Sequence, residues 1–218
     1  MKKNPSIGEQ LGMAEIALRN ALAMPKVAAA LAPFGYDAPR LRAAQELLAA
    51  AQTAVSAQAM AYGEQYEATA DLQAARAAAH EVYVNAVKIA RIAFKQDVQA
   101  RVALRLTGKR AQGLAGWVEQ TTVFYQNLLA APDLLAGMAP FGYNAARLAD
   151  ELALVRAVEV ANGRQEAAKG AARAATQDRD EKVRALRAWM SDFRVIAPIA
   201  LADSMQLLES LGLRVVRE

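Results

Sequence analysis

The chain lacks cysteine and contains a single histidine, His80. Disulfide bonds, zinc–thiolate sites and thiol nucleophiles are therefore excluded, and a chain without cysteine is typical of a reducing compartment. The residue three positions before His80 is Ala77, so no Glu-x-x-His pair exists and a ferritin-like di-iron centre is excluded. We interpret His80 as a structural or surface residue, because a lone imidazole has no assigned partner for acid–base chemistry.

Long hydrophobic runs are also absent. No stretch of about 18 or more uncharged apolar residues occurs, so we expect no membrane-spanning helix. Met1-Lys2-Lys3 is basic, like the start of a signal peptide, but Glu9, Glu15 and Arg19 interrupt the apolar positions that follow it. We therefore expect a cytoplasmic protein.

The glycine-containing motifs of common enzymes are missing. The sequence has no phosphate-binding G-x-x-x-x-G-K-[ST] loop, no dinucleotide-binding G-x-G-x-x-G after a strand and no G-x-S-x-G nucleophile elbow. We therefore do not expect a classical enzyme, and we assign no catalytic, cofactor-binding or metal-binding residue. An enzyme or small-ligand binder with an unrecognised site in the helical bundle is kept as an alternative.

Aromatic residues account for only 6% of the chain, although hydrophobic residues make up 55%, because alanine supplies much of the apolar fraction. Alanine is the strongest helix former and loses no side-chain entropy in a helix. No segment alternates apolar and polar residues with the period of two that half-buried strands show. The composition therefore predicts an all-α protein.

An internal repeat organises the sequence. The segment Pro33–Asp37 (Pro-Phe-Gly-Tyr-Asp) returns as Pro140–Asn144 (Pro-Phe-Gly-Tyr-Asn), at an offset of 107 residues (140 − 33). Matches at this offset include Leu22 with Leu129, Pro25 with Pro132, Arg40 with Arg147 and Gly63 with Gly170; further on, the offset shifts to 106 and pairs Tyr83 with Trp189 and Asp97 with Asp203. Matches in proline, glycine and aromatic residues do not arise from alanine richness, so we predict a tandem duplication with repeats at 1–107 and 108–218.

Each repeat begins with the same pattern. Apolar residues recur every three or four positions from Ile7 to Leu22 and again from Leu114 to Leu129, which indicates a first helix. The proline that follows suits the first turn of a short second helix. In the Pro-Phe-Gly-Tyr turn, the glycine suits the left-handed residue that ends a helix, and the next residue, Asp37 or Asn144, is a preferred N-cap.

A long helix is predicted to follow. A continuous helix from Asp37 to about Leu106 (residues 37–106) would have roughly 70 residues and a length of about 100 Å. The only glycine in this range is Gly63, and the one proline, Pro39, falls in the first helical turn, where proline is tolerated. We favour long helices, with a break near residues 63–71 as the alternative. In the second repeat the candidate break points are Asn162-Gly163, Gly170 and Asp178, and Pro198 is expected to kink a helix whose apolar face continues through Leu207, Leu208 and Leu211 until Gly212 ends it.

Two equivalent units with short connections most simply pack together. We therefore predict an elongated antiparallel helical bundle formed by tandem duplication of a helix–turn–long helix unit. Two separate three-helix domains are the alternative, and the linker Thr107–Gly113 is too short to decide between them.

Charged residues are interspersed, with a net charge of +4. The two carboxylate clusters are interpreted as helix-surface ion-pairing groups because basic residues lie nearby. These clusters are Glu64, Glu67 and Asp71, with Arg76 nearby, and Asp178, Asp180 and Glu181, with Arg179, Lys182 and Arg184 nearby.

The most basic stretch comprises Lys88, Arg91, Lys95, Arg101, Arg105, Lys109 and Arg110. It lies opposite an apolar stripe of Val84, Val87, Phe94 and Val98, as in any amphipathic bundle helix, so nucleic-acid binding is not favoured.

The repeated aromatic turn allows two interpretations. Phe34 and Tyr36, with Phe141 and Tyr143, either cap the ends of the core or form two equivalent patches that bind a partner or pair subunits. The first is the simpler interpretation. A phasin-like coat on a lipid or polymer surface is a further alternative, but it would need a broad apolar face outside the bundle.

The turn Phe34–Leu41 (Phe-Gly-Tyr-Asp-Ala-Pro-Arg-Leu) resembles a group of uncharacterised bacterial all-helical bundle proteins of about 200 residues. Four further segments resemble the same group, namely 175–180, 189–193, 199–203 and 208–212. The resemblance implies an all-helical fold and brings no activity, cofactor or catalytic residue. We therefore predict a non-enzymatic structural, scaffolding or protein-binding helical bundle that associates with an unknown protein partner or with itself, as in a homodimer.

Overall fold

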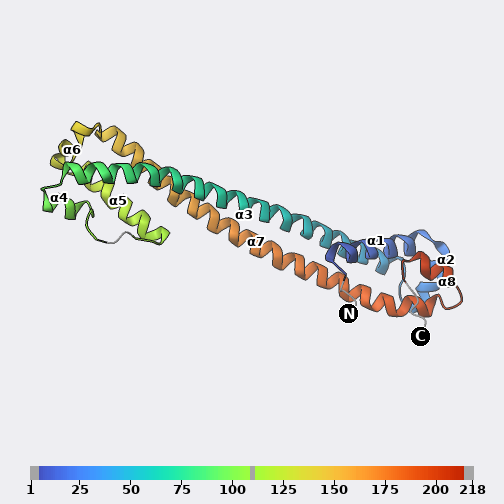
Figure 1. Cartoon of the computed structure of the whole chain (residues 1–218). Helices are drawn as coiled ribbons and strands as arrows, with labels where there is room; N and C mark the ends of the chain where they lie inside the picture. Colours follow the sequence, from blue (N-terminus) through green and yellow to red (C-terminus); the bar gives the residue numbers. More distant parts are fainter. Residues whose placement is uncertain (1–4, 109–110, 214–218) are drawn as a thin grey trace. The chain divides into compact units, whose positions relative to one another are not determined.

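A computed structural model describes residues 5–108 and 111–213 of the chain (Figure 1). The helices of the first half are α1 (Ile7–Ala23), α2 (Pro25–Leu31), the short 3₁₀ helix η1 (Ala32–Phe34), α3 (Ala38–Ala93) and α4 (Val98–Ala103). Those of the second half are α5 (Leu114–Ala130), α6 (Pro132–Met138), η2 (Ala139–Phe141), α7 (Ala145–Ala200) and α8 (Met205–Ser210). The described residues contain no strand, which confirms the all-α helical bundle.

The helices of the second half begin and end 107 residues after their counterparts in the first half, from α1 and α5 to α4 and α8. The predicted shift to an offset of 106 is therefore wrong. At an offset of 107, Asp97 corresponds to Ser204, and both are N-cap residues; buried Tyr83 corresponds to buried Met190. An alignment error of one residue moves a position by about 100° around the helix, from the buried face to another face. Matching buried positions therefore fixes the alignment of the two repeats better than matching residue types does.

The chain folds into two compact units whose limits differ from those of the predicted repeats. Unit 1 combines Met1–Tyr62 with Ala171–Glu218, and unit 2 is Gly63–Gly170. Each unit therefore joins the first helices of one half to the last helices of the other. In unit 1, the core includes Leu18 and Leu31 with Met190 and Phe193; in unit 2, Tyr83 belongs to the same core as residues of α5 such as Phe124.

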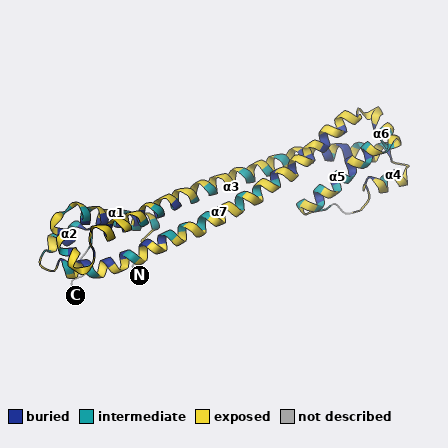
Figure 2. Ribbon diagram, turned by 180° about the vertical axis from the view of Figure 1, so that it is seen from behind, coloured by how far each residue is buried: buried dark blue, intermediate teal, exposed yellow. Residues whose placement is uncertain are grey.

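In each unit, a segment of α3 lies beside an antiparallel segment of α7. The Nε2 of Gln58 donates to Thr176 Oγ1 (3.2 Å) in unit 1, and the Nε2 of Gln165 donates to Thr69 Oγ1 (3.4 Å) in unit 2. Buried residues gather where the short helices cover these long helices, near α1 and α2 in unit 1 and near α5 and α6 in unit 2 (Figure 2). The cores are therefore formed where a third layer of helix is present.

The preference for long helices is confirmed. Helix α3 passes through Gly63, and α7 passes through Asn162-Gly163, Gly170 and Asp178, so none of the candidate break points ends a helix. Helix α3 nevertheless ends at Ala93 and not near Leu106 as predicted. The reason is Asp97, whose side chain accepts a hydrogen bond from the backbone N–H of Ala100 (2.8 Å) and starts the separate helix α4.

Pro198 lies inside α7 near its end, and α7 stops at Ala200. The prediction that the same helix continues through Leu207, Leu208 and Leu211 is wrong, because these residues follow a turn and belong to α8 and its C-terminal end. Proline has no N–H to bond to the carbonyl of Arg194, so α7 loses one of its last backbone hydrogen bonds at Pro198 and ends two residues later. Gly212 follows α8 with a φ of 69°, as expected for the residue after a helix.

The aromatic turns have the predicted geometry in both halves. Gly35 and Gly142 adopt left-handed φ values of 80° and 78° and end the 3₁₀ helices η1 and η2. The side chains of Asp37 and Asn144 accept hydrogen bonds from the backbone N–H groups of Arg40 (3.0 Å) and Arg147 (2.9 Å), which caps the long helices. The start of each long helix is thus set by local sequence.

We expect the two glycine-to-alanine changes Gly142→Ala and Gly163→Ala to act in opposite directions. Neither added methyl group would meet an atom within 4 Å, so the backbone decides the outcome. Gly142→Ala should lower the free energy of unfolding of unit 2 by about 1–2 kcal/mol, because alanine disfavours the left-handed conformation. Gly163→Ala should raise it by about 0.5–1 kcal/mol through helix propensity. Urea unfolding followed by circular dichroism measures both, and equal effects would contradict the turn geometry.

Because unit 1 contains segments of both halves, we expect Phe193→Ala in α7 to destabilise helices of the first half. Phe193 is fully buried in the same core as Leu18 and Leu31, so truncation should cost about 3–5 kcal/mol. Hydrogen–deuterium exchange should accelerate in α1 and α2 and stay unchanged in α5 and α6. Faster exchange in α5 and α6 instead would show that the second half packs on itself.

Candidate partner-binding surfaces

The two aromatic residues of each turn have different environments. Tyr36 and Tyr143 are buried, with the guanidinium groups of Arg40 and Arg147 lying 4.2 Å and 3.8 Å from the respective ring centroids. The core-capping interpretation is therefore confirmed for the tyrosines. Phe34 and Phe141 do not follow it, because they are 44% and 42% exposed.

Further exposed apolar residues recur at equivalent positions of the two halves. Ile92 corresponds to Ile199 and Val98 to Met205, and all four side chains are exposed. Each unit carries one member of each pair, together with one of the exposed phenylalanines: Phe34, Ile199 and Met205 in unit 1, and Phe141, Ile92 and Val98 in unit 2. Burial in the core does not explain why these positions are apolar in both halves.

A buried carboxylate distinguishes unit 2. Glu151 of α7 accepts a hydrogen bond from the hydroxyl of Tyr125 (2.9 Å) and pairs with the Nε of Arg147 (3.0 Å). The equivalent residues of unit 1 are Ala44 and Leu18, both fully buried, and there Arg40 donates instead to the backbone carbonyl of Gly35 (3.3 Å). The same position thus holds a polar cluster in one unit and an apolar contact in the other.

The polar cluster keeps its tyrosines neutral. Burial raises the pKa of Tyr125, and the adjacent Glu151 carboxylate raises it further; burial likewise raises the pKa of Tyr143. The hydrogen bond to Glu151 raises the pKa of Arg147 above its already high value. Because the folded state favours the protonated phenol, this contribution to stability is present below pH 10, the ordinary tyrosine pKa, and is lost as the pH rises above it. We therefore interpret the cluster as structural, with Tyr125 acting only as a hydrogen-bond donor at neutral pH.

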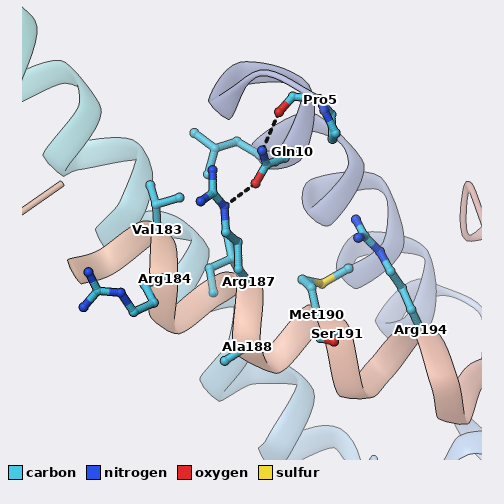
Figure 3. A pocket seen from close by; sticks show the side chains of 11 residues that line it. Pro5, Gln10, Val183, Arg184, Arg187, Ala188, Met190, Ser191 and Arg194 are labelled. Atoms are coloured by element: carbon cyan, nitrogen blue, oxygen red, sulfur yellow. Dashed lines mark hydrogen bonds between the residues drawn. The ribbon is translucent and has the colours of Figure 1, made fainter. Parts of the chain in front are cut away.

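A groove of about 620 Å³ lies in unit 1 between the start of α1 and the second part of α7 (Figure 3). The apolar residues lining it are mostly buried and include Leu11, Val183, Leu186 and Met190. Three arginines also line it: Arg184, Arg187 and Arg194. We call this feature the arginine groove. The Nε of Arg187 donates to Gln10 Oε1, which links the two helices.

A second groove, of about 700 Å³, lies in unit 2 between α5 and α7. Leu114, Val118 and Val158 supply its apolar lining, and Glu119 and Glu159 are the charged residues in it. No lysine or arginine lines this groove. The two grooves therefore differ in charge as well as in the helices that form them.

His80 and the carboxylate cluster of Glu64, Glu67 and Asp71 do not come together in a reactive site. His80 is exposed, and its nearest described aromatic neighbour is Trp117, with the ring centroids 6.3 Å apart. Glu64, Glu67 and Asp71 are exposed on α3 and form no ion pair with a described residue, so the ion-pair interpretation fails for this cluster. Within residues 5–108 and 111–213, no group of three or more histidine or acidic residues could hold a metal ion.

The second carboxylate cluster does form ion pairs, as predicted. Asp180 pairs with Arg179 (2.6 Å), while Asp178 and Glu181 both pair with Lys182 (3.7 Å and 3.3 Å). These contacts use the acidic side chains that precede the arginine groove along α7. Arg184 is not among their partners, although the sequence placed it in this group.

The basic stretch is divided between several elements. Lys88 and Arg91 are exposed near the end of α3, and Lys95 is exposed in the turn that follows it. Arg105 follows α4 and pairs with Glu119 (3.1 Å). Lys109 and Arg110 lie outside the described residues. In the opposing stripe, Val87 and Phe94 are buried as predicted, but Val98 is exposed because the chain turns before α4.

No helix in the described part of the chain is long and apolar enough to cross a membrane, as expected. No protein-family model, curated protein or solved structure matches the chain. Function is therefore inferred from the surfaces of this chain itself. Sequence analysis missed two of these features, the buried Glu151 cluster and the arginine groove.

The hydrogen bond between Tyr125 and Glu151 predicts coupled effects of two substitutions. Glu151→Ala should lower the free energy of unfolding of unit 2 by about 2–4 kcal/mol, because it leaves the buried Tyr125 hydroxyl without a partner. Tyr125→Phe should cost about 1–2 kcal/mol in the natural chain and close to nothing in the Glu151→Ala variant. Chemical unfolding of the four proteins measures the coupling, and additive costs would contradict it.

Proposed function

We propose that this chain is a non-enzymatic scaffold that binds a partner protein through two equivalent surfaces, one in each unit. The observation that carries the proposal is the exposure of Phe34 and Phe141 to nearly the same extent, in the same turn of both halves. The proposal includes a tandem duplication as the origin of the two surfaces. It also includes a cytoplasmic location, carried over from the sequence.

An exposed phenylalanine can still gain free energy when a partner covers it. A phenylalanine side chain gains about 1.5–3 kcal/mol when it moves from water into an apolar contact. The companion tyrosines are buried beneath each turn, whereas Phe34 and Phe141 keep more than two fifths of their surface exposed, and a partner could cover that part. Single exposed apolar residues are common on protein surfaces, so the support comes from their recurrence at three equivalent positions of the two units.

Two equivalent surfaces on one chain favour a scaffold. A partner that recognises one turn should recognise the other, because the backbone geometry and the arginine–tyrosine contact beneath the phenylalanine are shared. One chain would then hold two copies of the partner. Binding at two places also raises the apparent affinity for any partner that is itself multivalent.

The test places a photo-crosslinking phenylalanine derivative at position 34, 141 or 66 of the full chain in the cells that produce it. Tyr66 is the matched control, because it is an aromatic residue with 72% exposure and its counterpart in the other half is Arg173. We expect the same partner protein to be captured at positions 34 and 141 and not at 66. Equal capture at all three positions would remove the basis of the proposal.

Stoichiometry provides the second measurement with that partner. Native mass spectrometry should give two partners for each natural chain and one for Phe34→Ser or Phe141→Ser, since each exposed phenylalanine can be removed without opening the core. Circular dichroism should show unchanged helix content in both variants. Capture of a second copy of this chain, with no other protein, would favour self-assembly over the scaffold.

A further inference from the structure

The arginine groove contains three cationic side chains without anionic partners. Arg184, Arg187 and Arg194 form no ion pair with any residue in the described part of the chain. The acidic residues that precede them on α7 are already paired with Arg179 and Lys182. The groove is therefore complementary in charge to an anionic ligand.

The spacing of the arginines indicates the shape of that ligand. Arg184 and Arg194 are ten residues apart on one helix, which corresponds to about 15 Å along its axis. Positions 184, 187, 191 and 194 recur at helical spacing and therefore lie on one face of α7. In Figure 3, the side chains of Arg187 and Arg194 point towards α1, and that of Arg184 extends to the side of them. A single carboxylate cannot reach both ends of this row, so a ligand with several anionic groups along its length fits better.

The apolar lining indicates that the ligand is also hydrophobic. Most of the groove's lining surface is apolar, with contributions from Leu11, Leu186 and Met190, and such a surface gains little from a purely polar polyanion. Between the arginines, Ala188 and Ser191 are small and exposed, which allows another helix to approach α7 closely. A helix that presents leucine-like residues to the apolar lining and glutamates to the arginines satisfies both requirements.

The other half of the chain shows that the groove is not a by-product of the helical repeat. The positions equivalent to Arg184, Arg187 and Arg194 are Ala77, His80 and Val87. In place of Gln10, unit 2 has Trp117, whose buried side chain lies beside His80. In unit 2, the side chain of Trp117 therefore fills the position at which unit 1 has an open, basic groove.

We propose that the arginine groove of unit 1 binds an acidic amphipathic helix of a partner protein. The glutamates or aspartates of that helix pair with Arg184, Arg187 and Arg194, and its apolar face covers Leu11, Leu186 and Met190. This site shares no residue with the phenylalanine turns. Failure of the groove proposal would therefore leave the scaffold proposal unaffected, and the reverse also holds.

The experiment uses the full chain and a fluorescein-labelled helical peptide of leucine, alanine and glutamate, with leucines on one face and glutamates along both edges. Fluorescence anisotropy gives the dissociation constant. The variant is Arg184→Gln with Arg194→Gln, which keeps Arg187 and its hydrogen bond to Gln10. The matched control is Arg156→Gln with Arg164→Gln, which removes the same charge from exposed positions of unit 2.

We expect the groove variant to bind the peptide about tenfold more weakly than the natural chain, and the control variant to bind within about twofold of it. A peptide with glutamine in place of glutamate should also bind about tenfold more weakly, and raising the salt concentration from about 0.05 M to about 0.5 M should weaken binding of the acidic peptide. Equal affinities of the groove and control variants would overturn the proposal.

Two further controls separate the helix from other anionic ligands. A peptide of the same composition in scrambled order should bind weakly, because it lacks the continuous apolar face; equal binding would overturn the assignment to an amphipathic helix. Dodecanoate should not displace the peptide at equimolar concentration. Efficient displacement would instead identify the groove as a site for single-chain anionic amphiphiles.

Discussion

Each hydrophobic core of this protein requires residues from both halves of the chain. In unit 1, the ring of Tyr36 lies 5.4 Å from the rings of both Trp189 and Phe193, measured between centroids. In unit 2, the ring of Tyr83 lies 5.4 Å from that of Phe124. These aromatic contacts join segments that are far apart in sequence. The position of every surface discussed above depends on this exchange of segments.

The two halves share a framework and differ in what they add to it. The helix limits agree at every element, so the backbone provides a comparison of side chains within one molecule. Tyr125 and Glu151 of unit 2 occupy the positions of Leu18 and Ala44 in unit 1. A buried hydrogen bond in one core thus replaces an apolar contact in the other. At another, Gln10 stands where the other half has Trp117, and an open groove replaces a filled one. The exposed phenylalanines are the opposite case, since they are the same in both.

Much of the fold follows from local sequence. The proline, glycine and capping residues of the repeated turn predict the helix limits well, because each acts through its immediate backbone neighbours. The end of α3 is harder to predict, since Asp97 begins a new helix without a glycine or proline to mark the break. Glu151 could have been noticed, because it lies three residues after Leu148 and four before Val155 on the buried face of α7. The arginine groove depends on which residues of α1 face α7, and the periodicity of one helix does not contain that information.

The division of the chain into units has a consequence for synthesis on the ribosome. Unit 2 is continuous, so its core can close once residues 63–170 have emerged. Helices α1 and α2 precede unit 2 in the chain and belong to unit 1, whose core also needs the segment of α7 and the helix α8 that follow unit 2. Leu18 and Leu31 can pack on the first turns of α3 early, but the part of their surface that Met190 and Phe193 cover stays open until α7 has been made. Unit 2 can therefore close its core before unit 1, although α1 and α2 are synthesised earlier.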